Sequence, residues 1–257
     1  MKVGLIGAGN MARALARGWG EPVLVSDSGS GRGRELAAEL GGRAATNIEV
    51  AQEADLVVLC HKPYQLRLVA REIAPRVRGV ASVVGGVTSA SLLDAYPGVP
   101  VLRLMPNTPV EVRRGVVLYS PTVAADGSGP DPEFEAQVLE LFGRLGWVVT
   151  VPDELAPAAA ALTSVAPAYM ALVAEAQTDA GVRHGLRADL AGRLVTETMA
   201  GSAELLAARE LDTLTMRREV TSPRGSTARG LDALERGGLR SAFATAIDRV
   251  LSDQQAP

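Results

Sequence analysis

Short apolar segments recur through the first 150 residues and alternate with stretches in which apolar residues have helical spacing. The segments are rich in valine, isoleucine and leucine and are continuously apolar. This is typical of strands in a parallel sheet that is covered on both faces. We predict strands at "KVGLIG", "PVLVS", "ADLVVLC", "VASVVGG", "VPVLRLM", "GVVLYS" and "GWVVTV".

Between these strands, "NMARALARGW" and "QLRLVAREIAPRV" have the apolar spacing of helices. Before "EFEAQVLELFGRL", Asp131 is predicted to cap a helix that has Pro132 at its first position. The alternation of strands and helices predicts an α/β fold, with an N-terminal Rossmann-type parallel sheet domain.

The pattern changes after about residue 152, beyond which no strand-like segment remains. Three long stretches are helical by period and rich in alanine, so we expect them to be buried on several sides. A small domain cannot bury such helices alone, and a partner subunit is expected. We predict a dinucleotide-binding Rossmann domain over residues 1–152 and an all-helical dimerisation and substrate domain over residues 153–257.

Composition excludes several classes of function. A net charge of −3 gives no basic footprint for nucleic acid, and one cysteine with two histidines predicts neither a disulfide nor a metal site. The uncharged stretch from Leu155 to Ala174 approaches a spanning length, but its alanines and two prolines predict a buried helix and no membrane contact. The N-terminal segment is too short and too glycine-rich for a signal peptide, so we expect a cytoplasmic protein.

A glycine-rich turn follows the first predicted strand and opens the first predicted helix. Gly7 permits the tight turn, Gly9 allows the backbone to approach a pyrophosphate, and Ala12 still permits close helix–strand packing. The amides of the helix N-terminus suit phosphate. The turn therefore predicts a dinucleotide site that includes Gly7, Gly9, Asn10, Met11 and Ala12.

The end of the second predicted strand gives conflicting indications about the cofactor. Asp27 stands where an acid usually accepts hydrogen bonds from the adenosine ribose, which favours NADH. Ser28 and the arginines that follow suit a 2′-phosphate, which favours NADPH. If Asp27 reads the ribose hydroxyls, Asp27→Ser should shift the preference towards NADPH.

More specific motifs follow in the chain. "MPNTP" at residues 105–109 comes after "HKP" at 61–63 and "GGVT" at 85–88, and "APAY", "DAGV" and "VTSP" follow it. These motifs, with "GAGNMA" at the start, occur along the whole chain in the order typical of pyrroline-5-carboxylate reductases. The chain therefore resembles that family, although "GAGNMA" alone is shared with several other reductases.

The resemblance implies reduction of a cyclic imine carboxylate, 1-pyrroline-5-carboxylate, to L-proline, with NADPH or NADH as hydride donor. It implies a homodimer through the C-terminal helices and allows a larger ring of dimers. It also adds residues from the sheet edge to the cofactor site, namely Asn47, His61, Lys62, Pro63, Gly86, Met105 and Asn107.

The segment "VTSPRGSTARGL" at residues 220–231 is predicted to hold the substrate carboxylate. Hydroxyls precede a predicted helix whose first turn has no acid, so its amides are available to an anion. The competing interpretation is ordinary capping by Ser226 or Thr227. The resemblance places substrate contacts on Ser222, Gly225, Ser226 and Thr227. Thr227 would contact the ring nitrogen, and Glu210 is a second catalytic candidate.

Two segments depart from the family pattern. "SGSGPAY" is replaced by "TSVAPAY" at residues 163–169, and "SPGGTT" by "SPRGST" at 222–227. We expect Arg224 to disfavour a left-handed backbone and so to redirect the loop. The departures leave open an ordinary proline-forming enzyme and a relative that reduces a different cyclic imine in specialised metabolism.

Other classes also remain to be weighed. A 3-hydroxyacid dehydrogenase would need a catalytic lysine in a later helix, and no lysine follows Lys62. A deazaflavin-dependent NADP reductase would not need the long helical half. A dinucleotide-binding sensor without catalysis stays open, and an assay with pyrroline-5-carboxylate distinguishes it from a reductase.

Overall fold

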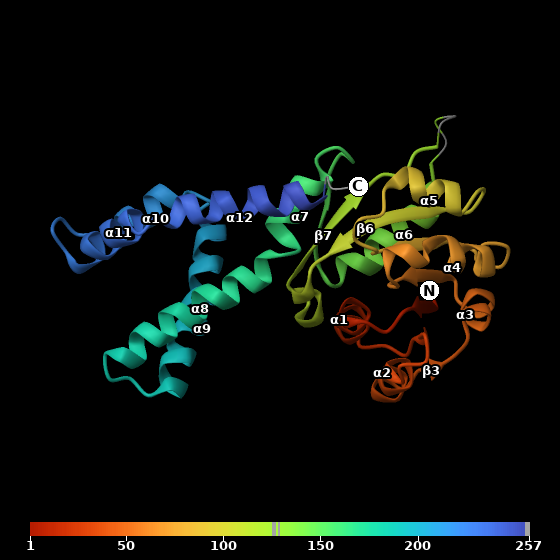
Figure 1. Cartoon of the computed structure of the whole chain (residues 1–257), viewed down its shortest axis with the longest axis horizontal. Coiled ribbons are helices and arrows are strands. Elements are labelled where there is room, and N and C mark those ends of the chain that lie inside the picture. The colour runs from red at the N-terminus through yellow and green to blue at the C-terminus, as the bar shows by residue number, and fades with distance from the viewer. Residues whose placement is uncertain (125–126, 128, 255–257) are drawn as a thin grey trace. The chain divides into compact units, whose positions relative to one another are not determined.

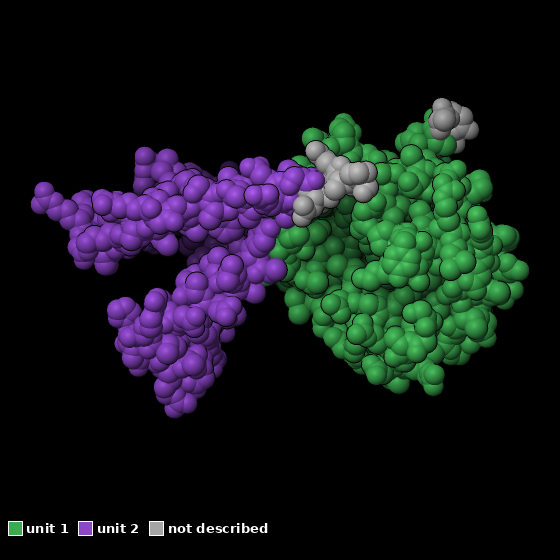
Figure 2. All heavy atoms as spheres, viewed as in Figure 1, with its two compact units in different colours: residues 1–167 green, residues 168–257 purple. Residues whose placement is uncertain are grey.

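The computed structural model describes residues 1–124, 127 and 129–254, and the end of the predicted second domain, residues 255–257, lies outside them. The chain forms two compact units, residues 1–167 and 168–257 (Figure 2). The first holds the sheet, and the second contains helices alone among its described residues. The domain boundary after residue 152 stays a prediction.

The first unit is built on one sheet that contains every strand predicted from the sequence, plus a two-residue strand that was not predicted. Within the described residues the order is β3-β2-β1-β4-β5-β6-β7-β8. The chain passes outwards through β2 and β3 and then returns to β4 beside β1, which creates a topological switch point between β1 and β4. The strands are β1 (Val3–Ile6), β2 (Leu24–Ser26), β3 (Arg43–Ala44), β4 (Leu56–Leu59), β5 (Val80–Ser82), β6 (Val101–Pro106), β7 (Gly115–Ser120) and β8 (Gly146–Thr150) (Figure 1).

The prediction of a parallel sheet is wrong for its last two strands. β6 pairs with β7 in the antiparallel direction, and β7 pairs with β8 in the parallel direction. The reason is the short connection after "MPNTP". A 3₁₀ turn, η2 (Thr108–Val112), joins β6 to β7, and such a short link permits only an antiparallel neighbour.

Helices cover the sheet on both faces. Buried residues of α1, α2 and α6 pack on one face in a single cluster, and those of α3, α4 and α5 pack with the other face. Asp131 caps α6 as predicted, accepting hydrogen bonds from the N–H groups of Glu133 and Phe134. The helices are α1 (Asn10–Trp19), α2 (Arg32–Leu40), α3 (Asn47–Glu53), η1 (Pro63–Gln65), α4 (Leu66–Ile73), α5 (Ser89–Ala95), α6 (Pro132–Gly143) and α7 (Ala156–Thr163).

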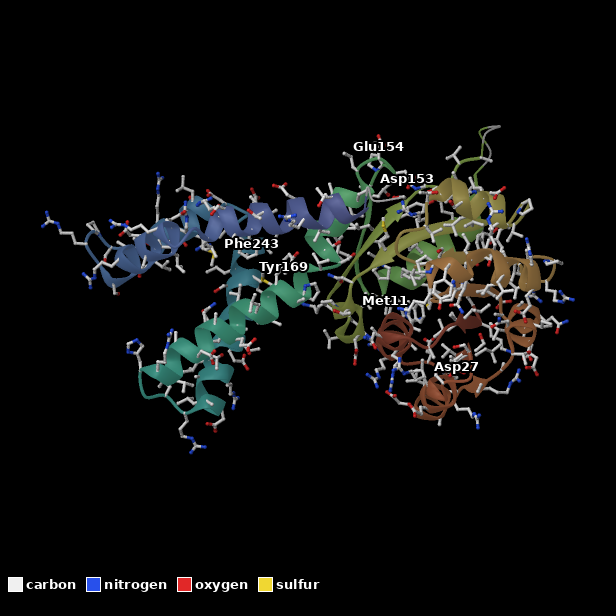
Figure 3. The ribbon with its side chains drawn as sticks, viewed as in Figure 1. Met11, Asp27, Asp153, Glu154, Tyr169 and Phe243 are labelled. Atoms are coloured by element: carbon white, nitrogen blue, oxygen red, sulfur yellow. The ribbon has the colours of Figure 1, made fainter. Side chains whose placement is uncertain are left out.

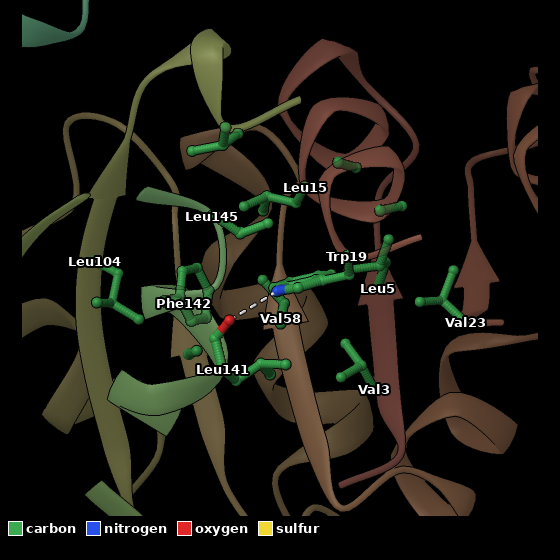
Figure 4. Packing of buried hydrophobic residues seen from close by; sticks show 14 of the residues in the cluster. Val3, Leu5, Leu15, Trp19, Val23, Val58, Leu104, Leu141, Phe142 and Leu145 are labelled. Carbon is green, nitrogen blue, oxygen red and sulfur yellow. Dashed lines mark hydrogen bonds between the residues drawn. The ribbon is translucent and has the colours of Figure 1, made fainter. Parts of the chain in front are cut away.

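Trp19, at the end of α1, joins two helices over the sheet. Its ring meets Phe142 of α6 edge-on, with the centroids 5.4 Å apart and the planes at 88°. Its indole N–H donates to the carbonyl of Leu141 at 3.1 Å, so the buried polar atom is satisfied (Figure 4). By contrast Trp147, on the edge strand β8, is 65% exposed.

The second unit contains α8 (Ala166–Arg183) from its third residue on, together with α9 (Ala188–Ala208), α10 (Thr213–Glu219), α11 (Ser226–Arg236) and α12 (Leu239–Gln254). The short α10 was not predicted; Asp212 caps it by accepting from the N–H groups of Leu214 and Thr215. Tyr169 of α8 contacts Phe243 of α12 edge-on, at a centroid distance of 6.4 Å (Figure 3).

The apolar side chains of this second unit are largely uncovered. Ala191 is its one residue among those described that is classed as buried, and Leu172 and Leu194 are 65% and 50% exposed. Among the described residues, the stretch Ala156–Arg183 is long and apolar enough to cross a membrane by length and composition, and 11% of its most apolar 18 residues are buried. This stretch is therefore mostly exposed in the structure, and its predicted burial stays a prediction.

Candidate functional site

The carboxyl ends of β1, β2 and β4 surround a cleft of about 260 Å³ at the topological switch point. Seven of the residues predicted for the cofactor lie together in its lining. The lining consists of Ile6, Gly7, Ala8, Gly9, Ser26, Asp27, Ser28, Ser30, Arg32, Asn47, Cys60, His61, Lys62, Gln65 and Val69.

The glycine turn forms one wall of the cleft. Gly7 has φ of 105°, and a Cβ there would lie 2.7 Å from the carbonyl carbon of Cys60, so both conformation and space require glycine. A Cβ on Gly9 would meet nothing within 4 Å, which leaves room for a ligand over the backbone. Asn10 and Met11 lie in the first turn of α1, which has no side-chain cap, and Ala12 is fully buried in the packing of α1.

Asp27, labelled in Figure 3, directly follows β2, and its carboxylate accepts hydrogen bonds from its own loop. One oxygen accepts from the N–H of Gly29 at 2.9 Å; the other accepts from the N–H of Gly33 at 2.7 Å and from Ser30 Oγ at 3.0 Å. The bond from Gly33 is the main reason that the pKa of Asp27 lies below its ordinary value. Asp27 is therefore ionised at neutral pH.

Asn47 lies at the first position of α3 and is held on both sides. Its Oδ1 accepts from the hydroxyl of Ser26 at 2.6 Å, and its Nδ2 donates to the carboxylate of Glu72 at 2.8 Å. Thr46 and Glu49 form a reciprocal capping box that fixes the helix start. The side chain of Asn47 is thus held rigidly in the wall of the cleft.

The "HKP" segment forms the opposite wall. Pro63 starts η1, and the N–H of Lys62 donates to the side-chain oxygen of Gln65 at 3.0 Å, so the strand end is turned sharply. Burial, the main cause, lowers the pKa of His61 below its ordinary value. The ring is therefore neutral near pH 7 and a poor proton donor. Burial also raises the pKa of the Cys60 thiol to about 12, so this thiol is protonated.

The cleft has one buried polar atom that needs a partner. Nδ1 of His61 lies 2.9 Å from the carbonyl oxygen of Lys62, so the ring donates there and Nε2 is the acceptor. Among the described residues this buried Nε2 has no hydrogen-bond partner. A hydroxyl-bearing ligand with phosphates fits this set: a hydroxyl can donate to Nε2, and the amides of α1 suit the phosphates.

Seven residues predicted for the cofactor do not line the cleft, namely Asn10, Met11, Ala12, Pro63, Gly86, Met105 and Asn107. Gly86 lies in the exposed loop after β5 with φ of 76°, and Met105 lies on β6 opposite Leu118. Asn107 is 8% exposed. Its Oδ1 accepts from the N–H of Val116 at 2.8 Å, so its amide holds the turn between β6 and β7.

Eight further residues line the cleft, and four of them, Ser26, Ser30, Arg32 and Gln65, have oxygen or nitrogen in their side chains; Arg32 is one of the arginines that the sequence suggested for a 2′-phosphate. The sequence carries a signal for two of them, because Ser30 and Arg32 follow Asp27 closely in the same polar loop. Gln65 stands three residues after Lys62, the spacing of a helical cap.

In the second unit, the predicted substrate loop leads into an uncapped helix. Gly225 precedes α11, and no side chain caps this helix within the described residues. The first intrahelical bond is from the N–H of Arg229 to the carbonyl of Gly225 at 3.3 Å. The three N–H groups before it, from Ser226 to Ala228, therefore have no intrahelical partner, and the capping interpretation is not met in this structure.

The expectation for Arg224 is wrong. Its φ is 60°, so the arginine adopts the left-handed backbone that we expected it to avoid. The reason lies in the loop's own bonds: Arg229 donates from its guanidinium to the carbonyl of Arg224 at 2.9 Å, and the N–H of Gly225 donates to the carbonyl of Ser222 at 3.0 Å. These contacts offset the strain, which is about 1 kcal/mol.

The other predicted catalytic and substrate residues lie around the same region of the second unit. Thr227 is half-buried at the second position of α11, while Ser222 and Ser226 are exposed. Glu210 is exposed in the turn that ends α9, where it has φ of 52° and is followed by Leu211 at 67°. The roles of these four residues stay predictions.

Comparisons with known proteins agree with these two halves. The family model "pyrroline-5-carboxylate reductase dimerisation" matches residues 153–256, and the model "NADP oxidoreductase coenzyme F420-dependent" matches residues 2–85. The pyrroline-5-carboxylate reductase of Thermus thermophilus is 34% identical, over 96% of this chain and 95% of its own. That of Pseudomonas aeruginosa is 33% identical, over 96% and 93%. The chain belongs to the pyrroline-5-carboxylate reductase family.

The fold supports this membership. A crystal structure of 1-pyrroline-5-carboxylate reductase from Streptococcus pyogenes matches with a TM-score of 0.86 and 28% identity, over 99% of this chain and 98% of its own. The predicted fold class is confirmed, and as a pyrroline-5-carboxylate reductase family member the chain is an oxidoreductase that uses NADPH or NADH. Its helical half is a homodimerisation domain.

Proposed function

We propose that this chain reduces 1-pyrroline-5-carboxylate to L-proline, with NADPH or NADH as the hydride donor. One observation carries the proposal. This chain, a member of the family, has both a glycine turn suited to phosphate and an uncapped helix N-terminus suited to a small carboxylate. The bound dihydronicotinamide supplies a hydride to the carbon of the C=N bond.

In this proposal the cofactor is held by the cleft of the first unit. The amides at the start of α1 bind the pyrophosphate, and the neutral His61 accepts a hydrogen bond from a hydroxyl of the cofactor. Lys62 adds a positive charge at the opposite wall. Gly86, Met105 and Asn107 are proposed to contribute through the neighbouring strand ends.

The substrate carboxylate is proposed to bind at the free amides of α11, with the hydroxyls of Ser222, Ser226 and Thr227 as further donors. A protonated imine becomes a neutral amine when it gains hydride, so the residues mainly have to orient the ring and exclude water. Thr227 is the proposed partner of the ring nitrogen. Glu210 is the second proposed catalytic residue, at the end of α9.

We further propose that the exposed apolar faces of α8 and α9 are covered by the partner subunit and not by lipid. The family model for this half is a dimerisation domain, which supports this interpretation of the apolar stretch Ala156–Arg183. We also propose that these dimers assemble into a larger ring. A location in the cytoplasm is a separate part of the proposal.

The test is the oxidation of NADPH and NADH by the purified protein on addition of 1-pyrroline-5-carboxylate, with proline identified as the product. Thr227→Ala should reduce turnover while dinucleotide affinity is nearly unchanged. An equal loss of both would contradict the assignment of Thr227. Cofactor binding without turnover of any ring imine would favour a sensor over an enzyme.

One observation favours a second candidate substrate. The exposed Arg224 places an additional guanidinium in the substrate loop, on a backbone that is otherwise fit for glycine. A different cyclic imine is therefore the alternative. Six-membered and sulfur-containing ring imines in the same assay decide between the two, since a higher kcat/KM for one of them would favour the alternative.

A further inference from the structure

We propose that Asp27 is a positioning residue that shapes the loop of residues 28–33 for the 2′-phosphate of NADPH, and that it does not read the adenosine ribose. This inference rests on the proposed binding of the dinucleotide in the cleft and is independent of which imine is reduced. It reverses the usual meaning of an acid at this strand end, which is a preference for NADH.

The hydrogen bonds of Asp27 leave little capacity for a ribose. A carboxylate offers about four acceptor positions. Three are already used, by the N–H groups of Gly29 and Gly33 and by the hydroxyl of Ser30, at 2.7 to 3.0 Å. A ribose diol needs two positions, so it would have to displace one of these internal bonds.

The carboxylate of Asp27, although it lines the cleft, is also packed against the start of α2. A Cβ on Gly33 would lie 3.3 Å from Cγ of Asp27, so the carboxyl group is seated directly against the first turn of α2. The loop that it closes bends through Gly29 and Gly31, which have φ of 92° and 81°. Asp27 therefore holds the loop at Gly29, Ser30 and Gly33, whereas the loop's own bond, from the N–H of Arg32 to Oγ of Ser30, is longer at 3.4 Å.

Donors face the cleft from the loop that Asp27 holds. Ser28, Ser30 and Arg32 all line the cleft, whereas Arg34 does not. Arg32 is exposed, and Gly31 caps α2 without a side-chain acceptor. The hydroxyl of Ser30 already donates to Asp27, so the donors left for a phosphate are the guanidinium of Arg32 and the hydroxyl of Ser28. Charge-assisted bonds from a guanidinium to a phosphate are the strong ones.

Charge decides between the two cofactors. Three charged side chains line the cleft: Arg32 and Lys62 are positive and Asp27 is negative. Asp27 keeps its negative charge, which three neutral donors stabilise, and the positive charges of Arg32 and Lys62 outnumber it in the lining. The balance favours a phosphorylated ribose.

The experiment uses two small probes that differ only in the 2′-phosphate, adenosine 2′,5′-bisphosphate and adenosine 5′-monophosphate. Binding of each to the purified full chain is measured by calorimetric titration. We expect the unchanged protein to bind the bisphosphate about ten-fold more tightly or better, which corresponds to one charge-assisted contact. Equal binding, or tighter binding of the monophosphate, would overturn the proposal. Failure of both probes to bind would also remove the dinucleotide assignment of the cleft.

Variants separate a positioning role from a ribose-reading role. Asp27→Ala and Arg32→Gln should each lower bisphosphate affinity about ten-fold with little change for the monophosphate. Arg34→Gln is the matched control and should change neither by more than about two-fold, since Arg34 does not line the cleft. Asp27→Asn, which keeps one acceptor oxygen, should lie between Asp27→Ala and the unchanged protein.

The sign of the effect of Asp27→Ala is the decisive result. A ribose-reading acid predicts that its removal raises bisphosphate affinity, whereas a positioning acid predicts that it falls. A rise, or no change, would overturn the proposal. A thermal melt of each variant verifies that the fold is intact, and Asp27→Asn supplies the same comparison if Asp27→Ala does not fold.

Discussion

Asn107 joins the end of β6 to Val116 on β7 through both its side chain and its backbone. Its Oδ1 accepts from the N–H of Val116 at 2.8 Å, and its own N–H donates to the carbonyl of Val116 at 3.1 Å. The Nδ2 group then donates to the carbonyl of Thr163 at the end of α7, at 3.3 Å. The residue that the motif "MPNTP" suggests as a cofactor contact thus also fastens three elements together.

Asn107→Ala is therefore expected to destabilise the first unit. The N–H of Val116 loses its acceptor in a partly buried position, which typically costs about 1–3 kcal/mol. Urea unfolding measures the loss. Asn107→Asp keeps the acceptor and should cost less, and an unchanged unfolding midpoint for Asn107→Ala would contradict the structural role.

Gly225→Ala tests the shape of the substrate loop. A Cβ at this position would clash with Oγ of Ser222 and would lie 3.0 Å from the carbonyl oxygen of Ser222, although the backbone φ of −68° suits any residue. We expect kcat/KM for the imine to fall about ten-fold or more through misplacement of the bound carboxylate, with dinucleotide affinity within about two-fold.

Gly230→Ala is the control in the same helix, because a Cβ there meets nothing within 4 Å. It should leave kcat/KM unchanged and stabilise α11 by up to about 1 kcal/mol. Full activity of Gly225→Ala would show that the substrate does not depend on this loop.

Arg103 on β6 is expected to matter for stability more than an ordinary surface arginine. It forms an ion pair with Asp153 and donates from Nε to the carbonyl of Val87 at 2.8 Å, and its side chain is 12% exposed. Arg103→Met should cost about 2 kcal/mol, below the usual value for a buried pair because Asp153 is 41% exposed.

The pair of Arg67 and Asp94 provides the comparison, since both of its side chains are largely exposed. Arg67→Met should change the free energy of unfolding by less than about 1 kcal/mol. Denaturant unfolding of both variants tests the contrast, and equal effects would contradict it.

His61 predicts a pH dependence of stability. Because burial holds its pKa in the folded state below the unfolded value of about 6.5, the unfolded chain binds the proton more readily. The resulting stabilisation is complete above pH 6.5 and is lost as the pH falls from 6.5 towards the folded pKa. His61→Gln should remove this part of the loss when urea midpoints are compared at pH 7.5, 6.5 and 5.5.

His184, the other histidine of the chain, lies exposed in the turn after α8 and serves as the control. His184→Gln should keep the full dependence. If His61→Gln and the unchanged protein lose stability in parallel, the buried imidazole is not its source.

The apolar face of α8 is exposed in the single chain, so we expect dimer formation to depend on this face. Leu172→Asp should dissociate the dimer, because it would place a charge in the covered interface. Leu68 on α4, which is exposed to almost the same extent, is the control. Light scattering after size exclusion measures the mass, and a monomer from Leu68→Asp but not from Leu172→Asp would contradict the assignment.

The sequence predicted the elements well where periodicity and composition agree. Every long strand and the helix starting at Asn10 follow from runs of apolar residues, and Asp131 with Pro132 marks a helix start by local chemistry alone. The reversal of β7 could not be derived from such runs, because it depends on the length of one connection. The helix α10 was missed because seven residues are too few to display a period.

The candidate site was predictable in composition but not in its contacts. One cleft brings together Gly7, Asp27, Asn47 and His61. This could be predicted, because the carboxyl ends of parallel strands share one edge of the sheet. The hydrogen bonds of the Asp27 carboxylate could not be predicted, because they come from the N–H groups of two glycines in a loop without periodicity. Arg224 likewise adopts a conformation that propensity disfavours, because contacts from Arg229 override it.

The contrast between the two tryptophans makes the protein its own optical reporter. Trp19 is buried against Phe142 of α6, so its fluorescence should be emitted at short wavelength. Trp147 is exposed to solvent, so its fluorescence should be emitted at long wavelength. A soluble quencher would reduce the fluorescence of Trp147 first. The remaining fluorescence, from Trp19, would then report the unfolding of the first unit without any added label.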